Sequence, residues 1–490
     1  MRMGPVKPRL RAAASVIAAL GVLSRLTFPV PAAHGAEPGA PVPAGQGGTA
    51  RAPSAGAAGS MEPEPGADSE AEEAPNSTEQ GQTHLTESFE RRPIATLLQE
   101  SRFVGLRDTT FSVLLRSFYD DKDNFNHTES QAWTLGGLAG FRTGYFLDFI
   151  RFGASGYTSQ RLDAPVDKDG TQLLQPGQKP YTVVGESYVQ LRLTDEISAL
   201  AGRKGLDTPF INTQDSLMTP NTFQAYAVQG VVGSMDEQSL RFGAGYFDKM
   251  KPRNSQDFES MATAAGAPAG VTRGVDVAGA NFKTGQLSIG AIDYYSPDII
   301  NIVYGETKIV IPLANKVRLQ FAGQYTRQNS TGDDLLTGKS FSTDQYGFKA
   351  EIAIGTVLLT SARTVTAVGT TNSAGSGTNV RSPWGGYPGY TAVQVENFFR
   401  AGEDATMLRA AYNFPRATGL SVYGLWVHGS TPQVARQYAQ TEYDLNLQWI
   451  PRIAALKGLN FRMRYGHVSQ EGPANQHEND LRLILNYVLR

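Results

Sequence analysis

The 490-residue sequence contains no cysteine, and this absence removes several kinds of chemistry at once. Disulfide scaffolds, cysteine-ligated zinc and thiol catalysis all need the thiol group. A chain without thiols suits an oxidising compartment, where a stray cysteine would be oxidised. The missing residue type therefore favours a protein that works outside the cytoplasm.

Long hydrophobic runs are also missing once the N-terminus is passed. Hydrophobic residues make up 40% of the chain, and no later run approaches the roughly 18 apolar residues of a membrane-spanning helix. The formal net charge of -2 gives no support to a basic nucleic-acid-binding surface. The chain is instead rich in glycine, tyrosine and phenylalanine (52, 20 and 23 residues), which favours many short strands over helices.

The first 36 residues have the organisation of a secretory signal peptide. A positive region around Arg2, Lys7 and Arg9 precedes a short apolar stretch from Ala12 to Leu23, and small residues follow at 33–36. The apolar stretch is too short to span a bilayer, and a buried N-terminal helix is the alternative interpretation. We expect residues 1–36 to be a signal peptide.

The next segment, residues 37–87, is rich in Ala, Gly, Pro and Glu. Its second half carries seven acidic residues between 62 and 79, with no Lys or Arg in that interval. Such a composition cannot bury enough apolar area to offset the entropy lost on ordering. We predict a disordered acidic tail here and a folded domain over residues 88–490.

The dominant pattern of the folded part is an alternation of apolar and polar residues. Between Tyr443 and Trp449 the odd positions are Tyr, Leu, Leu and Trp, and the even positions are Asp, Asn and Gln. The final segment, Leu481 to Leu489, places apolar residues at the odd positions in the same way. A period of two residues is the mark of a strand with one apolar face.

A soluble β-sandwich also alternates, but three features favour a barrel in a membrane. The alternating runs approach the roughly 9–11 residues that a tilted transmembrane strand needs. Aromatic residues such as Trp449 and Tyr487 lie near the ends of the apolar faces, and the opposite face is charged as well as polar. We predict an all-β protein, a transmembrane antiparallel β-barrel of about 18 strands with inward-folded loops.

Motifs of enzymes and metal sites are scarce. The sequence has no phosphate-binding P-loop, no HExxH and no GxSxG, and its six histidines have no metal-ligand spacing. Asp120, Asp121 and Asp123 resemble part of a calcium loop, but the required glycine and the distal glutamate are missing. We interpret these three as acidic turn residues, and we predict no enzymatic activity, no cofactor and no metal.

Arginines occupy the polar faces of several predicted strands. Their apolar sequence neighbours place the side chains in the lumen, where a planar guanidinium fork would attract carboxylate or phosphate. The alternative is that they pair with lumen Asp and Glu to brace the wall. The five arginines with this pattern are Arg116, Arg192, Arg462, Arg464 and Arg482.

Residues 202–226 interrupt the alternation with a long loop that contains Pro209 and Pro220. Long loops on rigid scaffolds are often functional, and in a wide barrel this one would fold inward and narrow the bore. A plain surface loop is the alternative. The predicted site residues of the region are Arg203 on the solute path and Asp207, Asn212, Asp215 and Asn221 in the constriction loop.

Several stretches resemble the OprD-like substrate-specific porins. They are residues 114–119, the segment 203–223, the run Trp384 to Thr391, residues 398–403 followed by 409–414, and residues 458–465 with 481–484. The resemblance covers residues 88–490 and implies an 18-stranded barrel with inward-folded loops. It also implies an arginine ladder that guides carboxylate-bearing nutrients.

By position, Arg116, Arg462 and Arg464 match the family's ladder, and Arg192 matches it more loosely. The resemblance further implies that the loop from Asp207 to Asn221 lines the constriction. One departure is Leu217, which stands where relatives often have arginine.

We therefore expect a channel of the bacterial outer membrane for passive diffusion of small polar solutes, carboxylate-bearing or zwitterionic. Its partners would be outer-membrane lipid and the solutes, with no nucleic acid, and its state monomer or trimer. The alternatives are a general diffusion porin without substrate preference and a secreted soluble β-protein acting as adhesin or enzyme.

Overall fold

A computed structural model describes residues 104–234, 238–313, 316–415, 419–472 and 475–489. The predicted signal peptide, residues 1–36, and the predicted acidic tail, residues 37–87, lie outside these ranges. So do residues 88–103, the first part of the predicted folded domain. The described fold therefore starts at Val104.

Nearly all of the regular secondary structure in the described chain is β-strand. The two α-helices, α3 (Val104–Arg107) and α4 (Met261–Ala264), and the two 3-10 turns, η1 (Val166–Lys168) and η2 (Ala454–Leu456), are all short. Within the described part of the chain, no helix is long and apolar enough to cross a membrane. The strands are β1 (Thr110–Asp123), β2 (Glu129–Arg142), β3 (Ile150–Asp163), β4 (Tyr181–Arg192), β5 (Ile197–Lys204), β6 (Thr222–Gly233), β7 (Gln238–Lys251), β8 (Glu259–Ser260), β9 (Val275–Thr284), β10 (Leu287–Ser296), β11 (Ile300–Leu313), β12 (Val317–Asn329), β13 (Ser342–Ile354), β14 (Val357–Thr366), β15 (Asp404–Asn413), β16 (Leu420–Ser430), β17 (Gln440–Trp449), β18 (Leu459–Gln470) and β19 (Gln476–Leu489).

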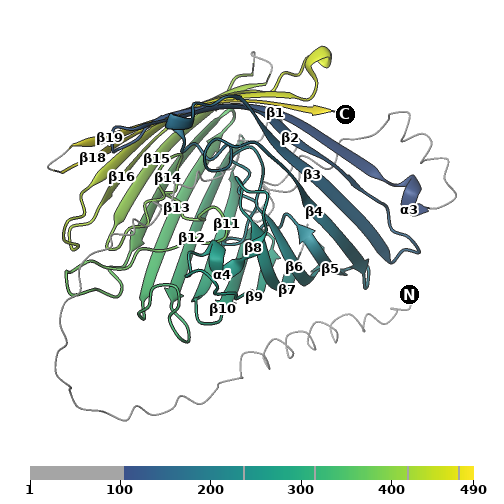
Figure 1. The fold of residues 1–490 in the computed structure, drawn as a ribbon, viewed down its shortest axis with the longest axis horizontal. Helices are drawn as coiled ribbons and strands as arrows, with labels where there is room; N and C mark the ends of the chain where they lie inside the picture. The colour runs from purple at the N-terminus through teal and green to yellow at the C-terminus, as the bar shows by residue number, and fades with distance from the viewer. Residues whose placement is uncertain (1–103, 235–237, 314–315, 416–418, 473–474, 490) are drawn as a thin grey trace, which may run out of the picture. The chain divides into compact units, whose positions relative to one another are not determined.

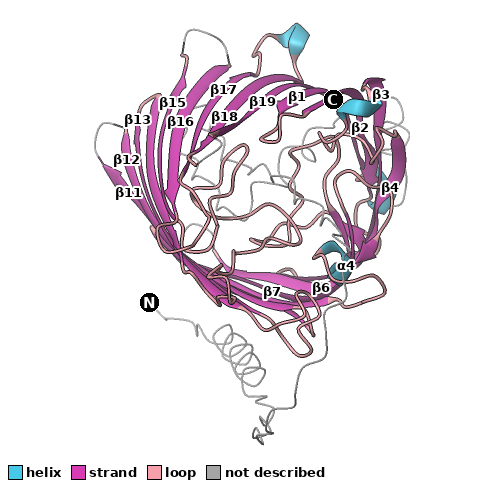
Figure 2. Ribbon diagram, turned by 60° about the vertical axis from the view of Figure 1, so that its left-hand side comes forward, coloured by secondary structure: helices cyan, strands magenta, loops and turns pink. Residues whose placement is uncertain are grey.

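The sheet closes on itself. Neighbouring strands of the ring pair antiparallel, and β1 pairs with β19 as well as with β2. The short β8 pairs only with the end of β7, which pairs directly with β9, so the ring consists of β1–β7 and β9–β19, 18 strands in all. Figures 1 and 2 show the closed wall. The predicted antiparallel barrel of about 18 strands is confirmed.

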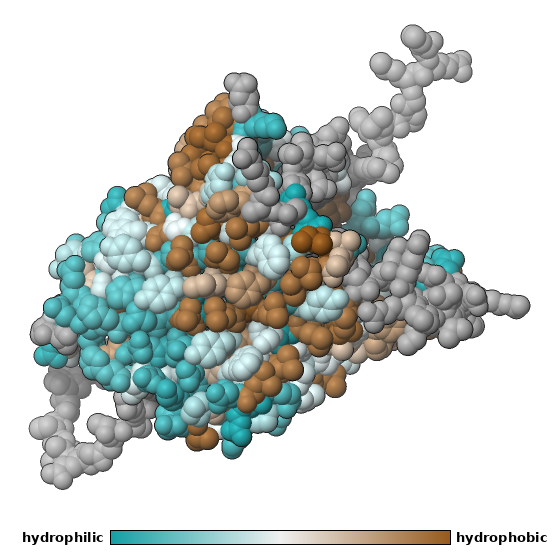
Figure 3. Space-filling view, turned by 90° about the horizontal axis from the view of Figure 1, so that it is seen from above, coloured by the Kyte–Doolittle hydropathy of each residue, from teal (hydrophilic) through white to brown (hydrophobic). Residues whose placement is uncertain are grey.

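The two faces of the wall differ as the alternation predicted. In β17 the side chains of Tyr443 and Leu445 are about half exposed on the outside, whereas Asp444 and Asn446 are buried inside. Outward-facing hydrophobic side chains recur on most strands, and Figure 3 shows them gathered over a broad part of the barrel surface, with hydrophilic residues toward one end. A closed sheet with an apolar exterior satisfies every backbone group of the wall while facing lipid.

The two ends of the barrel also differ. Links of two residues join β9 to β10 and β13 to β14, whereas residues 205–221, 252–274 and 367–403 form long connections at the other end. We call these the short-link end and the long-loop end. Figure 2 shows that loops cross the interior of the ring.

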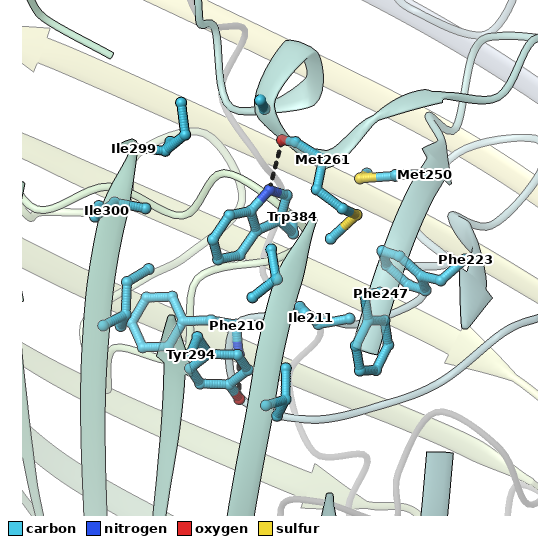
Figure 4. Packing of buried hydrophobic residues seen from close by; sticks show 14 of the residues in the cluster. Phe210, Ile211, Phe223, Phe247, Met250, Met261, Tyr294, Ile299, Ile300 and Trp384 are labelled. Carbon is cyan, nitrogen blue, oxygen red and sulfur yellow. Dashed lines mark hydrogen bonds between the residues drawn. The ribbon is translucent and has the colours of Figure 1, made fainter. Parts of the chain in front are cut away.

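The interior contains a hydrophobic cluster where loops meet the wall. Phe210 and Ile211 from loop 205–221 and Trp384 from loop 367–403 are fully buried against Tyr294 of β10 and Met261 of α4 (Figure 4). Phe210 packs edge-on against the rings of Tyr294, Tyr304 and Tyr387, at 5.9–6.1 Å between centroids. Burial of these hydrophobic side chains fixes the two loops inside the barrel.

Candidate functional site

Loop 205–221 has a fixed internal shape. One carboxylate oxygen of Asp207, Oδ1, accepts hydrogen bonds from the backbone N (2.8 Å) and Oγ1 (2.7 Å) of Thr213. Burial raises the pKa of Asp207, and the two hydrogen bonds from Thr213 oppose that shift. Asn221 closes the loop: its backbone N donates to the Thr213 carbonyl at 2.8 Å, and its Nδ2 donates to the Asn212 carbonyl at 3.2 Å.

The same loop is tied to loop 367–403. The side chain of Asn212 bonds twice to Gly386, accepting from its backbone N at 2.7 Å and donating to its carbonyl at 2.8 Å. Ile211 and Trp384 form a parallel bridge, and the Trp384 indole donates to the Met261 carbonyl at 2.9 Å (Figure 4). A Cβ at Gly385 would come within 2.5 Å of Asn212 Oδ1, so this close approach requires glycine.

Arg116 of β1 holds loop 205–221 to the wall. Its guanidinium donates to both carboxylate oxygens of Asp215, at 2.7 and 3.0 Å, and also to the Leu217 carbonyl. Its Nε donates to Asn486 of β19 at 2.8 Å. Leu217 itself is buried among apolar neighbours, which include Phe118 and Met218. The contacts of Arg116 therefore agree with the alternative interpretation, in which a lumen arginine pairs with an acidic residue and braces the structure.

Loop 367–403 has a second attachment, to the lumen face of β17. The two oxygens of Glu442 accept hydrogen bonds from the backbone N atoms of Val395 (2.7 Å) and Glu396 (2.8 Å). Asp444 accepts one from the backbone N of Gln394 at 3.1 Å. Sequence reasoning missed this inward loop. The available signal was the absence of alternation after residue 366, together with two carboxylates on a predicted lumen face.

Three predicted path arginines lie together on β18 and β19. Arg464 and Arg482 are partners in the strand register, both more than nine-tenths buried, and Arg462 lies two residues away on the same face. The Nε and Nη2 atoms of Arg464 have no hydrogen-bond partner among the described residues. Arg462 donates to Asn446 Oδ1 at 2.6 Å.

The neighbouring acidic residues distinguish Arg482 from Arg464. Arg482 makes a two-pronged ion pair with Asp480, with 2.9 Å from Nε to Oδ1 and 2.5 Å from Nη2 to Oδ2. Lys122 of β1 approaches the same Asp480 at 3.5 Å. Arg482 is thus braced by a carboxylate, whereas the ion pairs found in the described chain include none for Arg464.

The remaining two predicted path residues lie apart from this group. Arg192, the last residue of β4, lies at the short-link end with its guanidinium 4.0 Å from the centre of the Tyr145 ring. Arg203 pairs in register with Ser187 and Gln224. Its neighbours on β5, Gly202 and Lys204, face the opposite side of the sheet. That register places Arg203 on the outward face, where it stacks over Phe258 at 4.2 Å, and we leave it out of the path.

Arg253 is a cationic residue that sequence reasoning did not single out. It follows β7, and its Nη1 donates to Ser216 of loop 205–221 at 2.6 Å. Its carbonyl accepts from Tyr181 and Thr219, at 2.7 and 2.8 Å. Burial, and then the positive charge of Arg482, lower the pKa of Arg253 to about 10, so the side chain stays cationic at neutral pH. Its loop position carried no periodic signal.

The acidic residues compared with a calcium loop belong to the wall. Asp120, Asp121 and Asp123 all lie within β1, so the interpretation as turn residues is wrong. Asp120 faces the lumen as the register partner of Arg482. Within the described residues, no group of three or more histidines or carboxylates is arranged to hold a metal ion.

Known proteins resemble the chain in family and in fold. The family model described as outer membrane porin, OprD family, matches residues 103–490. No curated protein sequence matches the chain. The chain is similar in structure to OccK9 (OpdG) of Pseudomonas aeruginosa, with 20% identity, a TM-score of 0.67, and coverage of 79% of this chain and 100% of that one.

Two further solved structures resemble the chain to a similar degree. OpdK of Pseudomonas aeruginosa, crystallised with vanillate, has 19% identity and a TM-score of 0.65 over 79% of this chain and 99% of its own. A BenF-like porin from Pseudomonas fluorescens Pf-5 has 17% identity and a TM-score of 0.65 over 78% of this chain and 98% of its own. At these identities the structural likeness shows the fold.

Proposed function

The chain belongs to the OprD family of outer membrane porins, and from that premise we propose that its lumen arginines select small carboxylate-bearing or zwitterionic solutes. As a member, it is a channel of the bacterial outer membrane. The alternative of a secreted soluble β-protein is therefore excluded. In such barrels the short turns face the periplasm and the longer loops the exterior. We assign the two ends accordingly.

The observation that carries the proposal is the state of Arg464. Its guanidinium is buried in the lumen wall beside Arg462 and Arg482, and two of its nitrogens have no hydrogen-bond partner in the described chain. A buried guanidinium with unused donors attracts an anion that supplies the missing acceptors. A solute carboxylate has the charge and the planar pair of oxygens for this role.

Two further features support selectivity over general diffusion. Loops 205–221 and 367–403 are bound to each other inside the barrel, and Arg116 of β1 and Glu442 of β17 tie them to the wall, so the two loops narrow the lumen. Arg253 adds a cation from a third loop, within reach of the charge of Arg482. A solute passing the narrowed part therefore meets cations from a loop as well as from the wall. OpdK, a structural neighbour, was crystallised with vanillate, which carries a carboxylate.

The test is the reversal potential of the purified channel in a planar bilayer under a salt gradient. We expect anion preference in the parent and a smaller preference in the double variant Arg462→Ala with Arg464→Ala, because two lumen cations are lost. The matched control is Arg327→Ala with Arg363→Ala, which removes two exposed arginines. A parent without anion preference, or a double variant with the parent's reversal potential, would contradict the proposal.

A further inference from the structure

A second group of arginines gathers at the short-link end, away from β18 and β19. Arg142 is the last residue of β2, Arg151 the second residue of β3 and Arg192 the last residue of β4. Their sequence neighbours Phe141 and Phe152 are exposed on the outer face of the barrel. Since successive side chains of a strand point to opposite faces, the arginines of β2 and β3 face the lumen.

The register brings the three side chains to one patch of wall. Arg151 is the partner of Gln190 across β3 and β4, and Arg192 lies two residues farther along the same face of β4. Arg142 pairs with Gly153, again on the lumen side. Both Arg142 and Arg192 lie close enough to Arg151 for their positive charges to act on it. We call Arg142, Arg151 and Arg192 the mouth cluster.

Tyr145, in the link between β2 and β3, orders two of these side chains. The guanidinium of Arg192 lies 4.0 Å from the centre of its ring and that of Arg151 lies 4.8 Å from it. Arg151 is held further by Gln190, whose Oε1 accepts from Nε at 3.1 Å and from Nη2 at 2.7 Å. Stacking on a ring face leaves the edge of the guanidinium fork available to another acceptor.

No carboxylate neutralises the mouth cluster within the described part of the chain. The salt bridges found there include none for Arg142, Arg151 or Arg192. Glu186 lies on the same wall, but its two oxygens accept from the Ser155 hydroxyl at 2.8 Å and the Gly205 backbone N at 2.9 Å. Three guanidiniums without a counter-charge repel one another, and a bound anion would relieve that repulsion.

We propose that the mouth cluster is a distinct anion-binding site at the periplasmic mouth, fitted to solutes with two or more carboxylate or phosphate groups. It rests on the proposed anion passage, and it adds a second binding position beyond the arginines of β18 and β19. An anion that leaves those arginines is received by the mouth cluster before release. Multi-site binding of this kind lets a solute be attracted without being trapped.

The experiment measures block of single channels by citrate, and separately by pyrophosphate, added to one side of the bilayer. The orientation of the inserted channel is determined with the variant Val166→Cys, which carries a single accessible thiol. The chain has no cysteine of its own, and residue 166 is 65% exposed at the long-loop end. In the parent we expect block from the short-link side. In Arg142→Ala/Arg151→Ala/Arg192→Ala we expect that block to weaken about tenfold or more, because charge-assisted bonds are lost.

Controls separate this site from the rest of the lumen. Arg318→Ala removes an arginine near the same end, on β12, and should leave block from the short-link side unchanged. The variant Arg142→Lys/Arg151→Lys/Arg192→Lys keeps the charge of the mouth cluster but not the planar fork, and the anions should block it with intermediate strength. It also serves if the alanine variant fails to fold, as judged by heat-modifiable gel mobility.

Two results would overturn the proposal. Parent-like block in the triple alanine variant, in a channel whose anion preference still depends on Arg462 and Arg464, would reject the mouth cluster and leave the proposed function standing. Equal weakening of block from both sides would show that the three arginines set only the overall potential of the pore. If citrate blocks and pyrophosphate does not, the site recognises carboxylates; the reverse assigns it to phosphates.

Discussion

Arg116 and Asp215 are joined by two parallel hydrogen bonds, of 2.7 and 3.0 Å, across 99 positions of sequence. Arg116 comes from the first strand of the barrel and Asp215 from loop 205–221, which folds into the interior. The two-pronged geometry is the strongest form of an arginine–carboxylate contact. One arginine that matches the family's ladder by position is therefore engaged in holding loop 205–221 to the wall.

Arg116→Ala should release loop 205–221 from the wall and leave the barrel closed. Removal of one partner from a buried ion pair costs on the order of 3–5 kcal/mol, here at the expense of the docked loop. We expect a higher and noisier single-channel conductance, and faster chymotrypsin cleavage near Phe210 and Leu217. Asp215→Ala should behave alike. The comparison variant is Arg107→Ala, whose ion pair with Asp108 is exposed. A parent-like Arg116→Ala channel would contradict the role of the Arg116–Asp215 pair in holding the loop.

Trp384→Ala should destabilise the interior cluster that fixes two loops. Trp384 is fully buried and donates to the Met261 carbonyl at 2.9 Å. Truncation of a buried tryptophan costs about 3–5 kcal/mol, so we expect a lower free energy of unfolding in detergent and an altered conductance. Trp133→Ala makes the same change on the outer face, where the side chain is 46% exposed, and should cost less. Equal losses in the two variants would contradict this assignment.

Ion selectivity should change with pH through Glu396 in loop 367–403. Burial and the charges of Glu403 and Glu478 raise the pKa of Glu396 to about 7, against the opposing effect of Arg400. Above this pH the loop gains a negative charge, so anion preference should fall as the pH rises through about 7. Reversal potentials measured on both sides of this pH test the prediction.

The same shift determines how docking of the loop depends on pH. The ordinary pKa of the carboxyl is 4.5, so between about 4.5 and 7 the folded chain keeps a proton that an unfolded chain releases. The stabilisation from Glu396 is therefore full below that window and is lost as the pH rises through it. Glu396→Gln should abolish the pH dependence of selectivity, and Glu471→Gln, on an exposed residue near β18, should preserve it.

Local sequence is sufficient to predict the wall. A period of two residues depends only on the geometry of a strand, so the alternation around Arg462 and Arg464 is enough to place both side chains on the lumen face. The interruption of that pattern after Arg203 locates the loop, and the resemblance to a family indicates where it goes. The fold, the count of about 18 strands and the inward loop follow from these two sources.

Where loops fill the lumen, the alternation of apolar and polar residues is less informative. Phe210, Trp384 and Tyr294 are aromatic and yet lie inside the barrel, because the loops bring their own hydrophobic core into the lumen. Sequence reasoning assigned Arg203 to the path, although the strand register places it on the outer face. Alternation alone cannot identify the lumen face where both faces carry apolar residues.

The sequence by itself determined that this chain forms a barrel with an apolar exterior and a charged lumen, because those properties are periodic and local. Only the tertiary structure decided which lumen cations form ion pairs. Arg116 is paired with Asp215 and Arg482 with Asp480, whereas Arg464 keeps unused donors within the described chain. Such pairings depend on barrel closure and on loops folded back from distant parts of the chain, and the free energy of a charge depends on the neighbours that this folding supplies.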